Sequence, residues 1–378
     1  MKNYKNNRID VIIPAYKAQG TILRALSSIA CQTILSDVDV TIVNDCCPNG
    51  DYAEYVAMFA PYMNIREIKM PFNGGPGMAR QYGIDNTENQ YFTCMDADDT
   101  FAGTLALEML RTGISVEQKF QCCVGSFSEL HEGLNIVFHQ NDMVWMFGKL
   151  YKRAFIDKYN IRFNDTRANE DAGFNTIVRL LCNNSQTEAI NWISENVYYW
   201  HEKLDSITRI NDNQYTYDQS FCGWTDNMIY AIEKAKSVQP FNGSIDKWTL
   251  ECMMQLYAYY IETVAKKPVF AEQNWEYVKK FYHSCYKRIE ANITDEMMAI
   301  SYSMVMKGKR SGDAMNGIIP CIGIREFMEK LKYEPYNKDD IFDIWKRMPP
   351  ELIENNIRCG VCKAGYINNK DVDTNDHV

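Results

Sequence analysis

Residues 1–100 alternate between short apolar runs and amphipathic stretches, and this alternation restricts the fold more than any other feature. Between the runs, apolar side chains recur at helical spacing, as in 18–31, or a Gly-rich turn opens a helix, as in 73–86. The predicted strands occur at 9–16, 38–45, 64–69 and 91–95. Strands that alternate with helices at this spacing predict βαβ units, a mostly parallel sheet and therefore an α/β fold.

The strand predicted at 91–95 ends in three carboxylates, Asp96, Asp98 and Asp99. Carboxylates this close repel one another and resist burial, so an apolar strand that ends this way needs a partner charge. Mg²⁺ and Mn²⁺ take oxygen ligands, commonly one or two carboxylates together with the phosphates of a substrate. A solvated acidic turn is the alternative for a lone D-x-D, and the neighbouring strand ends decide between the two.

Two other predicted strands also end in polar or turn-forming residues. Pro14, Ala15 and Tyr16 end the first strand, and Asn44 and Asp45 end the second. The carboxyl ends of parallel strands meet at one edge of a sheet, where open α/β proteins bind their ligands. Ordinary loop chemistry explains any one of these ends. Three of them together, one triply acidic, favour a ligand cleft.

Composition limits the classes of protein open to this chain. Its 378 residues allow one large domain or two ordinary ones, and 46% hydrophobic residues are typical of a globular core. Membrane spans need ~18–20 apolar residues, and neither such a run nor a signal peptide is evident. The 13 scattered cysteines favour reduced thiols in the cytoplasm. A net charge of −9 argues against nucleic-acid binding over the whole surface.

The carboxyl-terminal part has a different pattern. Apolar residues at i, i+3 and i+4 predict a helical domain at 213–350, followed by a polar tail at 351–378. This helical region is the expected place for acceptor choice or for contacts between copies in a homo-oligomer. Cys359 and Cys362 form one C-x-x-C pair without a second pair nearby. A structural zinc site needs four ligands, so chance explains the pair better.

The segment 9–111 resembles the nucleotide-sugar half of an inverting family-2 glycosyltransferase with the GT-A fold, a Rossmann-like mixed sheet. The resemblance rests on VIIPAY, TIVNDCCPNGD and NGGPGMARQYGIDNTENQYFTCMDADD, and on the spacing between them. It ends near residue 210, which implies a GT-A domain at 1–212. The donor-nucleotide half would occupy 1–100 and the acceptor half 101–212.

The resemblance implies roles on the donor side. Gly75 opens a tight turn, Arg80 would face the diphosphate, Asp96 would hold ribose and metal, and Asp98 would hold the metal, Mn²⁺ or Mg²⁺. Many relatives have Asp where this chain has Asn44. UDP is the default nucleotide that the resemblance implies. The residues that would hold the base and ribose are Pro14, Ala15, Tyr16, Asn44 and Asp45.

Glu170 and Asp171 lie in a predicted helical segment at 164–181. Capping explains an acidic pair at a helix start, and Asn169 can cap the same helix. In the family that the chain resembles, a Glu-Asp pair at this point carries the catalytic base. The resemblance therefore implies that Asp171 deprotonates the acceptor, while Glu170 orients Asp171 or the acceptor.

Three further residues keep more than one interpretation. His201 lies in VYYWHEKLDSIT (197–208), which resembles the closing motif of the family. It can ligate a metal, pair with the diphosphate or be a satisfied core histidine. Lys149 and Lys152 lie in WMFGKLYKRAFI, the segment between the two halves, and either contact a phosphate or form a solvated surface.

The function predicted from these residues is that of an enzyme, a metal-dependent inverting glycosyltransferase that uses a nucleotide-diphosphate sugar. The acceptor stays open between a polysaccharide, a lipid-linked sugar, a protein side chain and a hydroxylated nucleic-acid base. The lack of a membrane span or basic amphipathic helix disfavours the lipid-linked sugar. Two alternatives come from other classes: a nucleotidyltransferase with a similar sheet, and a noncatalytic sugar-nucleotide or glycan-binding protein.

Overall fold

The computed structural model of the chain describes six stretches and a few later positions. The later positions are 249–250, 253, 256–257, 286–287, 289–295, 297 and 328, and the stretches are 4–48, 50–131, 135–166, 168–183, 185–202 and 214–238. The chain divides into two compact units, Met1–Pro240 and Phe241–Val378. Most of the predicted helical domain, the tail and the Cys359–Cys362 pair lie outside the described residues, as do positions 203–208 of the closing motif.

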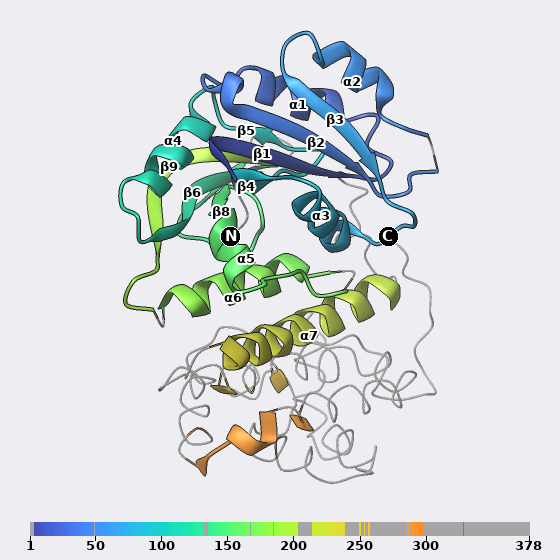
Figure 1. Cartoon of the computed structure of the whole chain (residues 1–378). Coiled ribbons are helices and arrows are strands. Elements are labelled where there is room, and N and C mark those ends of the chain that lie inside the picture. Colours follow the sequence, from blue (N-terminus) through green and yellow to red (C-terminus); the bar gives the residue numbers. More distant parts are fainter. Residues whose placement is uncertain are drawn as a thin grey trace, which may run out of the picture. The chain divides into compact units, whose positions relative to one another are not determined.

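The first unit is built on one mixed sheet with strand order β3-β2-β1-β4-β8-β6-β9-β5, and β7 pairs with β6 (Figure 1). The strands β1 to β4 are parallel, and β8 runs antiparallel to both β4 and β6. The bounds are β1 (Lys5–Ala15), β2 (Val38–Asn44), β3 (Asn64–Lys69), β4 (Asn89–Cys94), β5 (Thr100–Phe101), β6 (Phe120–Leu130), β7 (Ile136–His139), β8 (Lys149–Lys152) and β9 (Ala189–His201). The predicted α/β class with a mixed sheet is confirmed.

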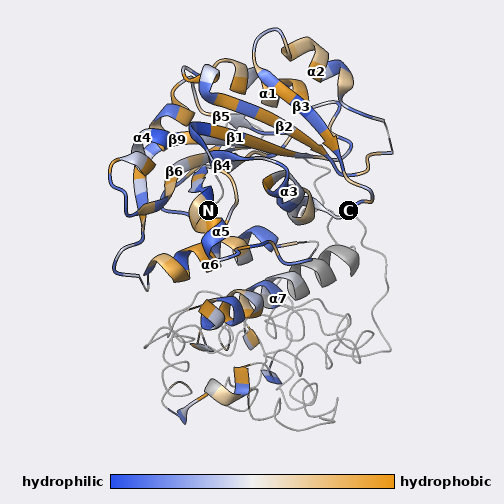
Figure 2. Ribbon diagram, viewed as in Figure 1, coloured by the Kyte–Doolittle hydropathy of each residue, from blue (hydrophilic) through white to orange (hydrophobic). Residues whose placement is uncertain are grey.

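Helices cover both faces of this sheet, because the side chains of its strands alternate between two apolar cores. Val11 of β1 packs in one core with α1 (Ile22–Ala30), α2 (Ala53–Phe59) and α4 (Ala106–Ser115). The next residue, Ile12, packs in the other core with α3 (Pro76–Asp85), α5 (Arg153–Lys158) and α6 (Glu170–Asn183). The central strands are among the most apolar parts of the unit (Figure 2). None of the helices in the described stretches has the length and apolarity of a membrane span.

A further helix, α7 (Gln214–Val238), packs on α6 within the first unit. The packing is close, because a Cβ added at Gly173 of α6 would lie 2.7 Å from Asn227 Oδ1 of α7. Next to this contact, Thr176 approaches the sulfur of Met228. The first unit therefore extends to residue 240, whereas the sequence placed the domain boundary near 212.

The three decorated strand ends meet at one edge of the sheet, as the parallel arrangement predicts. Ala15 at the end of β1 lies beside Asn44 at the end of β2, and Cys94 at the end of β4 lies beside Ile12. We call this edge, formed by the carboxyl ends of β1, β2 and β4, the carboxyl edge. His201 at the end of β9 reaches the same side, because β6 and β9 are parallel and β6 points the same way as β4.

Candidate active site

One buried arginine joins the acidic groups of the carboxyl edge. Arg80, on α3, is 5% exposed and donates through Nη1 to Glu170 at 2.7 Å and through Nη2 to Asp96 at 2.6 Å. Charge-assisted bonds of this kind fix both carboxylates in position. The start of α6 and the end of β4 are thus held on one guanidinium group. The predicted contact between Arg80 and a diphosphate stays a prediction, since both Nη atoms serve carboxylates here.

Asp171, the second residue of α6, has a strongly perturbed acidity. Burial, followed by the charge of Glu170, raises the pKa of Asp171 from its ordinary value of 3.8 to about 7, and the charge of Arg80 opposes this rise. Its Oδ1 accepts a hydrogen bond from the Ala172 N–H at 2.8 Å. A carboxyl group with a pKa near neutrality is suited to proton abstraction. This raised pKa is compatible with Asp171 as the base, which stays a prediction.

The aromatic run of β9 holds the end of the Asp cluster. Tyr198 donates through its hydroxyl to Asp99 at 2.9 Å and accepts the Asp96 N–H at 3.0 Å. The His201 N–H donates to the other oxygen of Asp99 at 2.9 Å. Sequence reasoning noticed this aromatic run without assigning Tyr198 a role. These three contacts make Asp99, which is 1% exposed, a structural residue of the cluster.

The environment of His201 disfavours its charged form. Burial, with a smaller effect of the Arg24 charge, lowers the pKa of His201 to about 4. Its Nε2 lies 2.9 Å from the Thr100 hydroxyl. A neutral imidazole can ligate a metal, and metal ligation, pairing with the diphosphate and core hydrogen bonding stay the three interpretations of His201.

Asp96 and Asp98 are the candidate oxygen ligands for a divalent cation. The Asp96 side chain is 29% exposed beside Arg80, and Asp98 is partly exposed on the same turn. Within the described stretches, no three His, Cys, Asp or Glu side chains form a metal-binding group, so Asp96, Asp98 and His201 are not assembled as one. The donor set fits a Mg²⁺ or Mn²⁺ ion that completes its shell with phosphate oxygens and water.

The second strand end shapes the loops on the donor side. Asn44 is 2% exposed and donates to Glu67 at 2.8 Å. The Asp45 carboxylate accepts the N–H groups of Gly74 at 2.7 Å and Gly75 at 2.9 Å. Gly75 has a φ of 82°, a conformation that favours glycine, at the residue before α3. Asp45 thereby positions the turn that leads to Arg80.

The first strand end leaves one aromatic side chain at the surface. Pro14 is partly buried and Ala15 is 1% exposed, whereas Tyr16 is 44% exposed. The Ala15 carbonyl accepts the Asp45 N–H at 3.0 Å, which ties the two strand ends together. An exposed tyrosine ring at this edge is suited to stacking on a base.

Neither lysine between the two halves is available for a phosphate. Lys149 is 1% exposed and donates to the carbonyls of Trp145 at 2.6 Å and Phe147 at 3.2 Å. Lys152 donates to the Gln118 carbonyl at 3.0 Å and lies toward the amino end of β4, away from the Asp cluster. The interpretation of these lysines as phosphate ligands is therefore wrong, because each satisfies backbone carbonyls instead.

Sequence reasoning missed a residue that fastens the loop before Glu170. Asn227, on α7, is fully buried and donates through Nδ2 to the Thr166 hydroxyl at 2.8 Å. The same Nδ2 donates to the carbonyls of Ala168 at 3.2 Å and Gly223 at 2.7 Å. The available signal was an asparagine within the apolar pattern of a predicted helix. Asn227 thereby links α7 to the start of the candidate catalytic helix.

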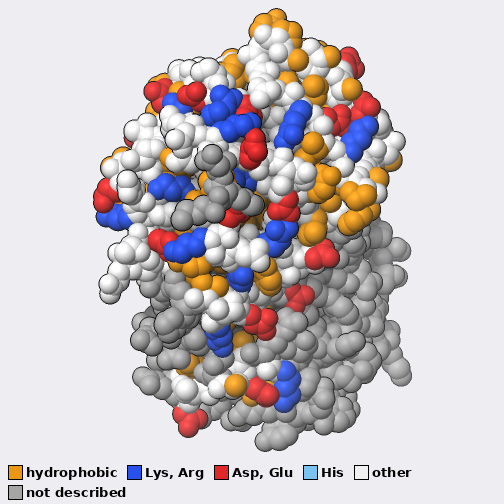
Figure 3. Space-filling model, in the orientation of Figure 1, with side chains coloured by type: hydrophobic (Ala, Val, Ile, Leu, Met, Phe, Trp, Pro, Cys, Tyr) orange, Lys and Arg blue, Asp and Glu red, His pale blue; other side chains and the backbone are white. Residues whose placement is uncertain are grey.

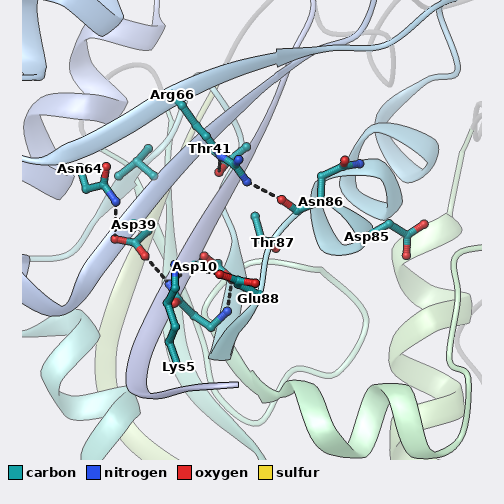
Figure 4. A pocket seen from close by; sticks show the side chains of 12 residues that line it. Lys5, Asp10, Asp39, Thr41, Asn64, Arg66, Asp85, Asn86, Thr87 and Glu88 are labelled. Carbon is teal, nitrogen blue, oxygen red and sulfur yellow. Dashed lines mark hydrogen bonds and ion pairs between the residues drawn. The ribbon is translucent and has the colours of Figure 1, made fainter. Parts of the chain in front are cut away.

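A cavity of about 580 Å³ opens on the opposite side of the sheet, at the amino ends of the strands (Figure 4). Its charged groups are paired, Lys5 with Glu88 at 3.0 Å and Asp10 with Arg153 at 2.8 Å. The side chain of Arg66 points to the Asn86 carbonyl across the cavity. Because these groups satisfy one another far along the strands from the Asp cluster, we do not assign the cavity to the active site.

Comparisons with known proteins point to glycosyltransferases. Residues 10–168 match the family described as glycosyl transferase family 2. An uncharacterized glycosyltransferase of Bacillus subtilis, EpsJ, is 26% identical over 53% of this chain and 63% of its own length. The glycosyltransferase GlyA of Streptococcus pneumoniae is 23% identical over 61% of this chain and 34% of its own length. The chain therefore spans less than two thirds of the length of either relative.

The fold has a counterpart among solved structures. The crystal structure of Staphylococcus aureus TarS 1-349 in complex with UDP-GlcNAc superimposes with a TM-score of 0.63 at 16% identity. The match covers 82% of this chain and 87% of that one. At this identity the likeness concerns the fold, which agrees with the mixed sheet and its decorated carboxyl edge. Residues 10–168 are thus similar to glycosyl transferase family 2, and the fold agrees with the GT-A architecture.

Proposed function

We propose that this protein is an inverting glycosyltransferase that moves a sugar from a nucleoside-diphosphate sugar to an acceptor hydroxyl. The observation that carries the proposal is the Asp171 carboxyl group, whose pKa is raised to about 7. It lies beside Glu170, which shares the Arg80 guanidinium with Asp96 of the donor-side cluster. A base held next to the donor-side carboxylates is the arrangement that a direct displacement needs.

The chemistry proceeds in one displacement. Asp171 accepts the proton of the acceptor hydroxyl while the acceptor oxygen bonds to the anomeric carbon, on the face opposite the diphosphate. The bond from the anomeric carbon to the diphosphate oxygen breaks, and the nucleoside diphosphate leaves with the electron pair. The anomeric centre is thereby inverted without an enzyme nucleophile. General base catalysis typically contributes ~10²–10⁴-fold to the rate.

The donor is proposed to bind along the carboxyl edge. Tyr16 and the turn held by Asp45 would face the base and ribose, while Asp96 and Asp98 would hold a Mn²⁺ or Mg²⁺ ion against the diphosphate. When bound, such an ion stabilises negative charge on the leaving diphosphate. UDP is the proposed nucleotide, supported by the resemblance of the donor half and by the UDP-GlcNAc bound to TarS.

The test is a matched pair of carboxylate substitutions on the two sides of Glu170. Asp171→Asn removes the proposed base and is expected to lower sugar transfer at least ~10²-fold, as loss of a general base does. Asp165→Asn changes an exposed carboxylate in the loop before α6, and this variant is expected to transfer sugar at a rate within about twofold of the wild type. Transfer by Asp171→Asn at the wild-type rate would show that the assigned base is wrong.

A further inference from the structure

An exposed tryptophan lies on the carboxyl edge, in the loop between β7 and β8. Because β8 runs antiparallel to β4, this loop lies toward the end of β4 that carries the Asp cluster. Trp145 is 40% exposed, yet its backbone is held on both sides. Its N–H donates to Asp142 at 3.0 Å, and its carbonyl accepts Lys149 Nζ at 2.6 Å and Asn175 Nδ2 at 2.8 Å. The loop is thus fixed while the indole ring remains accessible.

The buried ammonium group of Lys149 helps to fix the conformation of this loop. Lys149 is 1% exposed, and burial lowers the pKa of its ammonium group. Asp142, which bonds the Val144 and Trp145 N–H groups, lies 3.8 Å from Lys149 Nζ. Burying an ammonium group is costly unless it is well bonded, and these bonds all go to the loop itself. The bonds of Lys149 and Asp142 therefore stabilise the conformation of this loop.

Asn175 connects the loop to the proposed base. It lies four residues after Asp171 on α6, so the two side chains share one face of the helix about 6 Å apart along its axis. Asn175 Nδ2 donates to the carbonyls of Val144 at 3.1 Å and Trp145 at 2.8 Å. The backbone of Trp145 is therefore fixed about one helical turn from Asp171.

A column of aromatic rings connects Trp145 to the Asp cluster as well. The indole stacks on Phe147 with ring centroids 5.9 Å apart and an interplanar angle of 10°. Phe147 in turn stacks on Tyr198 at 4.6 Å and 4°, and the Tyr198 hydroxyl donates to Asp99. Two independent sets of contacts thus link Trp145 to the base helix and to the donor-side carboxylates.

We propose that Trp145 is the platform on which the acceptor stacks, and that the acceptor is a saccharide. A fixed indole presents an apolar face with negative π charge, which matches the C–H face of a pyranose ring. A serine or threonine side chain or a phosphate-rich chain offers no comparable flat apolar surface. The inference rests on the proposed function and names the acceptor class for the same site, with a ring hydroxyl facing Asp171.

The experiment measures acceptor kinetics with the nucleotide sugar from which the wild type releases nucleoside diphosphate. The saccharide probes are methyl glycosides of glucose, galactose, mannose and N-acetylglucosamine, and the competing probes are glycerol phosphate and a serine peptide. Trp145→Ala is expected to raise the KM for the productive glycoside about tenfold relative to the KM for the donor. This tenfold change corresponds to about 1.4 kcal/mol of lost stacking free energy. Trp145→Phe is expected to recover part of this loss, because it retains a ring.

Trp192→Ala provides a matched control. Trp192 is also 40% exposed, but it lies in the amino half of β9, nine residues and about 30 Å of strand from His201. Its removal is expected to leave the glycoside KM within about twofold. An unchanged glycoside KM in Trp145→Ala, or transfer to glycerol phosphate or the peptide but to no glycoside, would overturn the saccharide assignment alone. Failure of the wild type to release nucleoside diphosphate from any donor would overturn the proposed function and this inference with it.

Discussion

The acidity of Asp171 depends on groups that come from three different elements. Its own burial raises the pKa most, Glu170 adds to the rise, and Arg80 on α3 and Asp96 after β4 act in opposite directions. Helix-start carboxylates that only cap have no need of such an environment. This environment, rather than the Glu-Asp sequence alone, distinguishes a base from a cap.

The pH dependence of transfer follows from the raised pKa. Asp171 must be unprotonated to accept a proton, so the transfer rate is expected to rise with pH through about 7 and then level off. The measurement is kcat from about pH 5 to about pH 9 with saturating donor and acceptor. A rate that is flat across this range would show that no group with this pKa controls the chemistry.

Glu170→Gln tests the cause of the shift. It removes the neighbouring negative charge, whereas the positive charge of Arg80 stays beside Asp171. Both effects favour the ionised form of Asp171. The pH limb of kcat is therefore expected to move to lower pH in this variant. A limb that stays in place would assign the titration to another group.

At the level of single residues, the sequence indicated the residues of the candidate site but not the contacts that these residues make. The Glu-Asp pair and the Asp cluster were identified from the motifs. The double pairing of Arg80 was not, because Glu170 lies 90 positions away along the chain. Lys149 was misjudged for the same reason: a buried lysine that binds loop carbonyls has the same local sequence as a surface lysine.

The helix α3 approaches the start of α6 closely at one glycine. A Cβ added at Gly77 would lie 2.5 Å from Glu170 Cγ and 3.0 Å from its Cβ. Gly77→Ala is therefore expected to displace Glu170 from Arg80, to lower transfer about tenfold or more and to cost about 1–3 kcal/mol of stability. Transfer assays and thermal unfolding measure both effects. Gly20→Ala is the control, since a Cβ there meets no atom within 4 Å; equal behaviour of the two variants would contradict this account.

The helix α7 supports the same region from the other side. Asn227→Ala removes the three hydrogen bonds made by Nδ2 and is expected to destabilise the protein by about 1–3 kcal/mol, with a lower kcat. Thermal unfolding and transfer assays measure the two effects. Ser237→Ala removes an exposed hydroxyl bond to a carbonyl on the same helix and is expected to change little. If Asn227→Ala were as stable and active as Ser237→Ala, the role of Asn227 in stabilising the loop before Glu170 would be refuted.

The elements show where sequence patterns suffice and where they fail. The strand predicted at 64–69 coincides with β3, because its place in the alternation of strands and helices can be recognised along the chain. Within the segment 164–181, the helix start predicted at Glu170 coincides with α6, whereas the loop bonds from 164–166 and 168–169 to α7 were not predicted. That loop is stabilised by contacts about 60 positions apart, which no local periodicity records.

Over the whole chain, the α/β class follows from the order of strands and helices, and the GT-A architecture follows from the motifs that resemble the family. Residues 214–238 read as part of a helical domain, yet this helix packs on α6. The surface agrees with the overall charge of −9: Figure 3 shows basic side chains interspersed with acidic ones over the described part of one face. Such a face favours a neutral or mixed acceptor over a polyanion.

Metal dependence belongs to this scale, because the ion would join protein and donor. Removal of divalent ions with EDTA is expected to abolish nucleoside-diphosphate release, and Mn²⁺ or Mg²⁺ is expected to restore it. Asp98→Ala is expected to require a higher metal concentration for half-maximal activity. Full activity in EDTA would refute the role assigned to Asp96 and Asp98 as metal ligands.

The most direct test of the central claim is to identify the phosphate product. The purified protein would be incubated with Mn²⁺ and a panel of nucleotide sugars, or with nucleoside triphosphates and sugar phosphates, and the released products quantified. A glycosyltransferase releases a nucleoside diphosphate from one preferred donor, and UDP is the expected product. Release of pyrophosphate from a triphosphate would instead identify a nucleotidyltransferase. Donor binding without release of nucleoside diphosphate, even with acceptor candidates present, would identify a noncatalytic binding protein. Either result would contradict the account.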